Sequence, residues 1–147
     1  MKSLLKFSYA PKDHEVKVKY SQTTPDGRTE TVTLESAEEP RQELVAALQA
    51  LAPFVCALCE FPAEWGCDGM TVRGVTINRS DETPGLTITA LRALMHIQTP
   101  LVLNTPYTTE FGEPCAVALE KLEKLVLAYV DGERAQASLG LEKEGVA

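Results

Sequence analysis

The residues best suited to metal or redox chemistry are four cysteines, three of them close together in the chain. Cys56, Cys59 and Cys67 have the spacing C-x2-C-x7-C, and Cys115 or His96 is available as a fourth ligand. Zinc favours such sets of soft ligands. The residues around Cys56 and Cys59 are apolar, however, as at the end of a helix, and differ from the polar, glycine-containing turns of zinc sites. We expect thiols that act as small hydrophobic side chains, with no metal and no cofactor; zinc binding by the four cysteines is the alternative left open.

Catalysis by these cysteines would require an activated thiolate, which is usually found at the amino terminus of a helix. Cys56 and Cys59 instead fall toward the carboxyl end of a predicted helix. The two histidines, His14 and His96, have no recognisable orienting group or oxyanion loop beside them. The sequence also lacks phosphate-loop, zinc-protease, serine-hydrolase and dinucleotide-binding motifs. These observations favour a protein without enzymatic activity, and we predict no catalytic residue.

Cationic and aromatic side chains are the candidates for binding. Three arginines lie in or beside the central predicted strands, where a sheet can direct guanidinium groups toward phosphate or carboxylate. Two aromatic residues lie in predicted loops, where such side chains anchor partners or stack on bases. Two lysines alternate on an amino-terminal strand. The predicted partner-binding residues are therefore Arg73, Arg79, Arg92, Trp65, Tyr107, Lys17 and Lys19. The alternatives are arginines paired with nearby Glu, aromatic residues that cap the core, and lysines that protect an edge strand.

The formal net charge of −7 argues against general binding to nucleic acid, because counterion release requires many Lys and Arg contacts. Residues 1–20 are locally basic, with five Lys against two acidic residues, so a basic edge on an acidic body is available for docking. Apolar residues make up 44% of the chain, but no apolar run approaches the roughly 20 residues that cross a bilayer. We expect a soluble, cytoplasmic protein that does not enter a membrane.

Six segments have the composition of β-strands. Residues 5–9, 16–20 and 86–90 alternate apolar with polar side chains, and residues 29–34, 70–78 and 101–103 are rich in β-branched or large apolar residues. Turn-forming sequences separate neighbouring strands at residues 10–13, 25–27 and 80–85. The apolar phase changes around Gly74, which predicts a β-bulge there.

Two segments have helical periodicity. Ser36 and Glu39 form a capping-box pattern, which predicts a helix start at that point. The segment continues to residue 58 with leucines spaced three and four apart, and Pro53 predicts a kink or a break into two helices. A final helix is predicted from Pro114 to Gly132.

The order of these elements predicts an α+β fold, with an antiparallel sheet in βββα-βββα order and two helices packed on one face. We expect a single domain over residues 1–134 and a flexible tail over residues 135–147.

The segments 72–78, 85–90 and 100–106, the last ending in Asn104-Thr105-Pro106, resemble small uncharacterised phage proteins from early, recombination-associated gene regions. The resemblance covers about a third of the chain and contains no catalytic signature, so no functional residue is carried over. It implies a phage origin, the cytoplasm of a bacterial host, and an accessory role in DNA metabolism or against host defence.

Taken together, these features favour a non-enzymatic phage accessory or inhibitor protein that binds a host or phage protein, for example one of the nucleic-acid or defence machinery. Its acidic body would then imitate nucleic acid toward a basic target. A second hypothesis is a small-ligand binder such as a nucleotide sponge. A third is an enzyme whose site is assembled across the fold. A homo-oligomer is compatible with all three.

Overall fold

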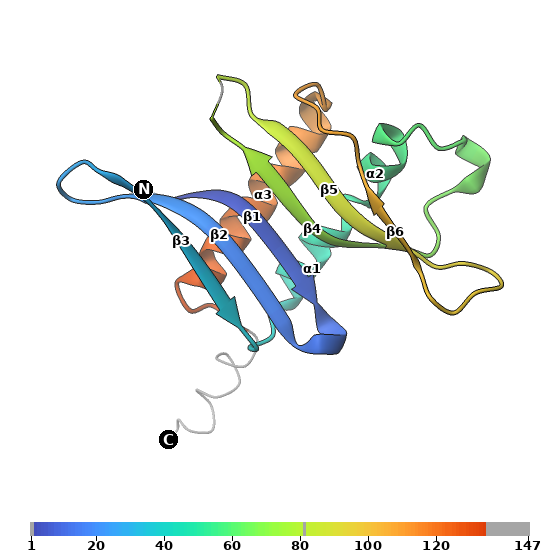
Figure 1. Ribbon diagram of the computed structural model, residues 1–147, viewed down its shortest axis with the longest axis horizontal. Coiled ribbons are helices and arrows are strands. Elements are labelled where there is room, and N and C mark those ends of the chain that lie inside the picture. The colour runs from blue at the N-terminus through green and yellow to red at the C-terminus, as the bar shows by residue number, and fades with distance from the viewer. Residues whose placement is uncertain (1, 81, 135–147) are drawn as a thin grey trace.

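The computed structural model describes residues 2–80 and 82–134 (Figure 1). The tail predicted to be flexible, residues 135–147, lies outside the described residues. A single antiparallel sheet has the strand order β3-β2-β1-β4-β5-β6. Its strands are β1 (Lys2–Ala10), β2 (Glu15–Thr23), β3 (Thr29–Ser36), β4 (Met70–Asn78), β5 (Gly85–Arg92) and β6 (Leu101–Asn104).

Three α-helices accompany the sheet: α1 (Gln42–Gln49), α2 (Ala52–Leu58) and α3 (Gly112–Val130). Two short 3-10 helices, η1 (Pro11–Asp13) and η2 (Ala63–Trp65), lie in connections. The α+β class with an antiparallel sheet, predicted from the sequence, is therefore confirmed. The first helical segment is divided into α1 and α2, with Pro53 in the first turn of α2. No helix in the described part of the chain is long and apolar enough to span a membrane.

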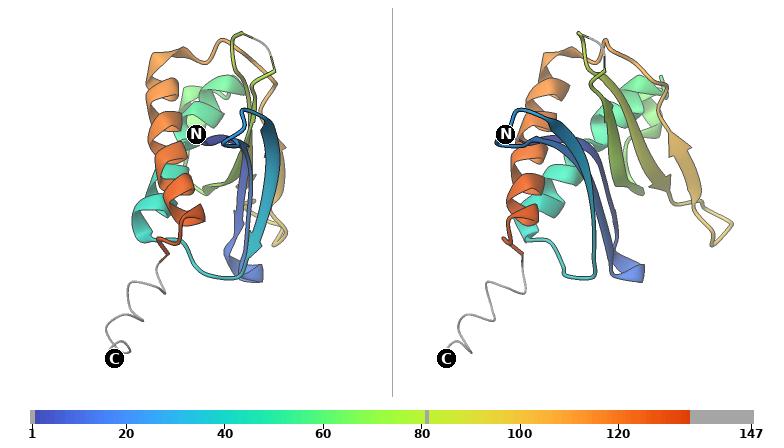
Figure 2. Two further views of the ribbon diagram at one scale, coloured as in Figure 1. Left: turned by 90° about the vertical axis from the view of Figure 1, so that its left-hand side faces the viewer. Right: turned by 60° about the vertical axis from the view of Figure 1, so that its left-hand side comes forward.

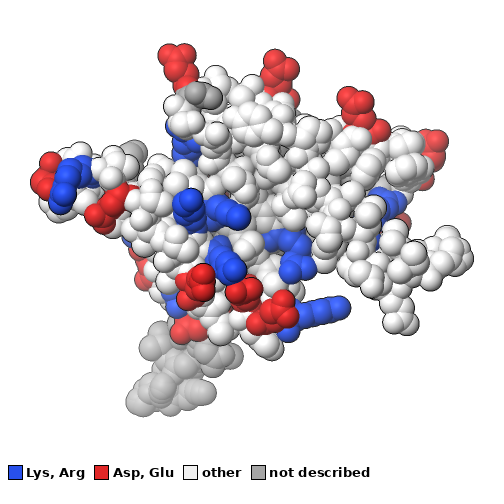
Figure 3. Space-filling model, viewed as in Figure 1, with Lys and Arg blue, Asp and Glu red and all other residues white. Residues whose placement is uncertain are grey.

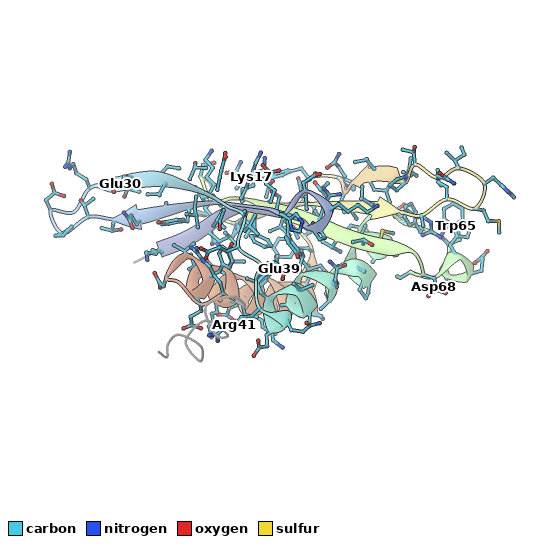
Figure 4. The ribbon with its side chains drawn as sticks, turned by 90° about the horizontal axis from the view of Figure 1, so that it is seen from below. Lys17, Glu30, Glu39, Arg41, Trp65 and Asp68 are labelled. Carbon is cyan, nitrogen blue, oxygen red and sulfur yellow. The ribbon has the colours of Figure 1, made fainter. Side chains whose placement is uncertain are left out.

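The helices lie against one face of the sheet and leave the other face open (Figures 2 and 4). Alternate side chains of the middle strands point toward the helices and are buried, among them Phe7, Val18 and Ile88. Leu122 and Val126 of α3 are fully buried in the same core. Because successive strand residues point to opposite faces, this packing also fixes which side chains lie on the open face.

The predicted start of the first helix at Ser36 is wrong. The Ser36 hydroxyl accepts a hydrogen bond from the amide of Glu38 at 3.0 Å, and α1 begins only at Gln42. Pro40 disfavours helical geometry in the residue before it and forms an isolated β-bridge with Arg134. The Tyr129 hydroxyl donates to the Glu38 carbonyl, so α3 also holds this connection in place.

The centre of the sheet is a short joint between β1 and β4. The two strands pair only over Lys6–Ser8 and Gly74–Thr76, whereas β1 pairs with β2 from Lys2 to Ala10. The register shifts beside the joint on both strands, between Leu4 and Lys6 and between Val72 and Gly74. A bulge near Gly74 was predicted, and the structure has one there. The right view of Figure 2 shows the two three-stranded halves twisting away from each other.

Two arginines occupy the two ends of this joint. Arg73 donates from Nε to the Tyr9 carbonyl at 3.2 Å, and Arg79 donates from Nε to the Leu4 carbonyl at 2.9 Å. Glu123 of α3 completes the second end by accepting from the Leu4 amide at 2.9 Å and from Arg79 Nη2 at 3.1 Å. These side chains satisfy backbone groups that the shortened ladder leaves without a strand partner.

We expect Gly74→Ala to destabilise the protein by about 1–3 kcal/mol, because the added methyl group would collide with the Phe7 carbonyl oxygen across the joint. Urea unfolding followed by circular dichroism measures the change. Thr76→Ser, at an exposed position of the same strand, is the control and should change stability by less than about 0.5 kcal/mol. Equal stabilities of the two variants would contradict a close backbone approach at Gly74.

Candidate functional site

The helices leave one face of the sheet uncovered (Figure 4), and this open face carries Lys6, Lys17 and Lys19 from the amino-terminal strands. Figure 3 looks onto this face and shows Lys and Arg side chains gathered over its middle, with Asp and Glu below them and around the margins of the view. Figure 4 shows Lys17 pointing away from the helices. Lys6, Lys17, Lys19 and Arg73 are the basic residues that the register places here, and we call them the basic cluster.

The basic cluster lies directly on the β1–β4 joint. Lys6 is the register partner of Lys19 on β2, so two cationic side chains stand opposite each other, an arrangement that destabilises a sheet. Lys17 is partly neutralised, because its Nζ lies 3.4 Å from Glu15 Oε2. Within the described residues, neither Lys6 nor Lys19 forms an ion pair. A ligand with negative charge would relieve this repulsion.

A concavity of about 270 Å³ opens between these side chains. Its charged lining comes from Lys6, Lys17 and Arg73, and hydroxyl groups of Ser8, Thr76 and Thr89 add further hydrogen-bonding capacity. Because Lys6 belongs to one half of the sheet and Arg73 to the other, the concavity spans the joint.

A larger concavity of about 850 Å³, here called the open-face groove, lies beside the first. Arg73 lines both concavities, so they form one continuous surface. The η1 turn makes one wall of the groove, and the loop between β5 and β6 makes the other. This loop exposes apolar side chains, with Met95 at 89% and Ile97 at 60% accessibility. The surface thus combines cationic groups at one end with apolar groups at the other.

The structure separates the three arginines predicted to act together. Arg73 joins Lys17 and Lys19 on the open face, while Arg79 contacts Glu123 of α3 on the helix-covered side. Arg92 lies at the end of β5 beside η2. Lys6 and the loop carrying Met95 and Ile97 were not among the predicted binding residues. The local lysine excess was a signal for Lys6, and the unbroken uncharged run around Met95 was a signal for the loop.

Trp65 and Tyr107 are each 53% exposed but lie away from both concavities. The Arg92 guanidinium lies 5.9 Å from the Trp65 ring centre and 5.8 Å from that of Phe61, and it donates to the Trp65 carbonyl at 3.4 Å. Tyr107 packs over Gly85, where a larger residue would displace its ring. Both aromatic side chains therefore have contacts within the fold.

The cysteines do not form a metal centre in the described part of the chain, where no group of three or more suitable ligands is found. Cys56 and Cys67 lie together, with 2.8 Å between their sulfur atoms, and Cys59 follows the last residue of α2 as its C-cap. Only Cys115, in α3, is fully buried. Burial, and next the hydrogen bond to Cys67, raise the pKa of Cys56 to about 11. Burial alone raises the pKa of Cys115 to about 11. Neither thiol is activated as a nucleophile.

Comparison with protein-family models, curated protein sequences and solved structures gives no match for this chain. The chemistry of the site must therefore be judged from its own residues. The open face offers cations, hydroxyl groups and an apolar wall, which can bind and orient a ligand. Its lining contains His96 in the groove wall but no pair of side chains arranged as nucleophile and base.

We expect the reactivity of Cys56 to be low at neutral pH and to rise with pH. A raised pKa keeps the thiol protonated, so the thiolate fraction and the alkylation rate should increase about tenfold per pH unit until the pH approaches the pKa. Alkylation by iodoacetamide, followed by peptide mass spectrometry, measures this dependence. Full alkylation of Cys56 at neutral pH, at the rate of a free cysteine, would contradict the assigned shift.

We also expect oxidised glutathione to convert the Cys56 and Cys67 thiols into a disulfide with release of two glutathione thiols, because the two sulfur atoms are already adjacent. Peptide mapping without reduction would identify the linked pair. Cys56→Ser should abolish the link, and Cys115→Ser should leave it unchanged. A link from Cys56 to Cys59 in place of Cys67 would show that the neighbouring thiols are paired differently.

Proposed function

We propose that this protein is a non-enzymatic binding protein whose open face receives a segment of a partner protein that is both acidic and apolar. The observation that carries the proposal is the pairing of Lys6 with Lys19 across neighbouring strands without an ion-pair partner for either in the described residues. A sheet gains nothing in stability from such a pair. Carboxylates of a partner would supply the missing counter-charge.

The open-face groove supports the apolar part of this ligand. Met95 and Ile97 form an exposed apolar wall within reach of Arg73, which belongs to the basic cluster. A peptide that carries acidic side chains toward the joint and an apolar side chain toward the loop would complement both ends. Exposed apolar groups rimmed by polar ones are typical of protein-binding surfaces.

A nucleotide ligand is supported less well. Arg73 and the hydroxyl groups around it suit a phosphate, but neither Trp65 nor Tyr107 lines the groove or the smaller concavity. A base would therefore find no exposed tryptophan or tyrosine ring on which to stack. An apolar side chain of the peptide would cover the wall of Met95 and Ile97, which a nucleotide would leave largely exposed.

Imitation of nucleic acid by an acidic body is also less well supported. On α3 the acidic residues Glu113, Glu120 and Glu123 are interspersed with Lys121 and Lys124. Glu123 is moreover occupied with Arg79 and the Leu4 amide. This helix thus presents charges of both signs. A phage accessory role, with a host or phage protein as partner, is part of the proposal and rests on the resemblance of residues 72–78, 85–90 and 100–106.

Charge reversal tests the proposed site. The double variant Lys6→Glu/Lys19→Glu should weaken binding of a fluorescein-labelled peptide of alternating Glu and Leu by at least about tenfold, because attraction becomes repulsion. Fluorescence anisotropy measures the affinity, and added salt should weaken binding by the wild-type protein. Lys121→Glu, an exposed lysine on α3, is the matched control and should bind as the wild type does.

Competing ligands make the outcome decisive. Single-stranded DNA and a panel of nucleotides are measured under the same conditions. Binding of a nucleotide without binding of the acidic peptide would replace the proposal by the small-ligand function. Equal affinities of the wild type and the double variant would show that the basic cluster is not the binding site.

Charge reversal at Lys19 should weaken peptide binding but stabilise the fold. Lys19→Glu should raise the free energy of unfolding by about 0.2–1 kcal/mol, because it replaces a like-charge pair by an ion pair with Lys6. Urea unfolding at low ionic strength measures the gain. Lys121→Glu again serves as the control. A loss of stability in Lys19→Glu would mean that Lys6 and Lys19 do not repel each other in the folded protein.

A further inference from the structure

The exposed edge of β6 is a second surface with an unusual composition. Among the described residues, β6 has a neighbour only on its β5 side, so its outer backbone groups have no strand partner there. Leu101 and Val102 of this strand are 46% and 60% exposed. Residues 101–109 contain no Asp, Glu, Lys or Arg, and we call this stretch the uncharged edge.

The opposite edge of the sheet is different. β3 carries Glu30 and Glu35, and Arg28 and Asp26 form an ion pair in the turn before it. Charged residues on an edge strand prevent pairing with another chain. Each molecule therefore has one edge protected by charge, at β3, and one edge without charged residues, at β6.

We propose that β6 pairs antiparallel with β6 of a second copy of this chain, so that two six-stranded sheets join into one. The occupant is a second copy because a two-fold interface must be complementary to itself, and an uncharged apolar strand meets this condition. Two molecules with a net charge of −7 repel each other, and the uncharged edge is where they approach with the least repulsion.

The prolines beside β6 and the charged β3 edge limit the assembly to two copies. Pro100 and Pro106 flank β6 and cannot donate backbone hydrogen bonds, so the new ladder is confined to the short segment between them. The protected β3 edge cannot accept a third copy. A closed dimer is expected, and a growing fibre is not.

Sedimentation velocity over a range of protein concentrations tests this assembly. The wild type, with a monomer mass of 16.0 kDa, should approach twice that mass as its concentration rises. Val102→Lys should weaken dimerisation at least about 100-fold, because each copy would bring an unpaired charge into the interface. The matched control is Val117→Lys on α3, where the side chain is 58% exposed, and it should dimerise as the wild type does.

The response to added salt distinguishes the dimer interface from the proposed peptide site, and the dimer does not depend on the function of that site. Dimerisation should strengthen with added salt, which screens the repulsion between two acidic molecules, whereas binding of the acidic peptide should weaken. Val102→Lys should not lose affinity for the acidic peptide, and Lys6→Glu/Lys19→Glu should keep its dimer at high salt, where its added negative charge is screened. Each hypothesis can therefore fail without the other.

Three results would overturn the dimer. The first is a wild-type protein that stays monomeric up to about 1 mM. The second is an equal effect of Val102→Lys and Val117→Lys. The third is a mass that continues to grow beyond two copies with concentration. Circular dichroism melting of both variants confirms that each is folded, which the exposure of both positions leads us to expect.

Discussion

The fold depends on the short β1–β4 joint, because within the described residues it is the only strand pairing that unites the two three-stranded halves into one sheet. Three residue pairs are few for a central ladder, and the bulge beside Gly74 brings the two backbones too close for a side chain. The joint is completed by side chains: Arg73 and Arg79 satisfy carbonyl groups of β1 at its two ends, and Glu123 ties the second end to α3. Side-chain hydrogen bonds here do what strand pairing does elsewhere.

The basic cluster lies where the sheet has its shortest ladder of paired residues. Lys6 lies in the joint itself, opposite Lys19, and the nearest concavity is lined from both halves. The helices cover the other face with apolar contacts, so burial and charge are divided between the two sides of one sheet. A protein selected only for stability would gain from a neutral or acidic residue at position 6 or 19. In the proposed function, this like-charge pair is the feature that would distinguish a binding surface from a merely solvated one.

Much of the architecture was predictable from the sequence because local patterns agree with the fold. Alternating residues identified the strands, Pro53 marked the division of the first helical segment, and the change of phase at Gly74 marked the bulge. The start of α1 was not predicted, because the capping pattern at Ser36 competes with Pro40 and with a distant contact to Tyr129. Local rules carry no information about such a contact.

The site was predicted only in part for the same reason. The face of Lys17 and Lys19 follows from simple alternation along β2, and that of Lys6 from alternation along residues 5–9, but the pairing of Lys6 with Lys19 depends on the register shift between Leu4 and Lys6. The roles of Arg73 and Arg79 depend on carbonyl groups left open by tertiary pairing, which no spacing in the sequence reveals.

The division of the concavity between the two halves has a dynamic consequence. A sheet held at its centre by three pairs can open there locally without unfolding either half, and such openings permit exchange of the amide hydrogens of the joint. A ligand held by Lys6 on one side and Arg73 on the other would act as a clamp across this line. Its affinity would then include the free energy needed to suppress the opening, so occupancy of the face and rigidity of the whole sheet would be thermodynamically linked.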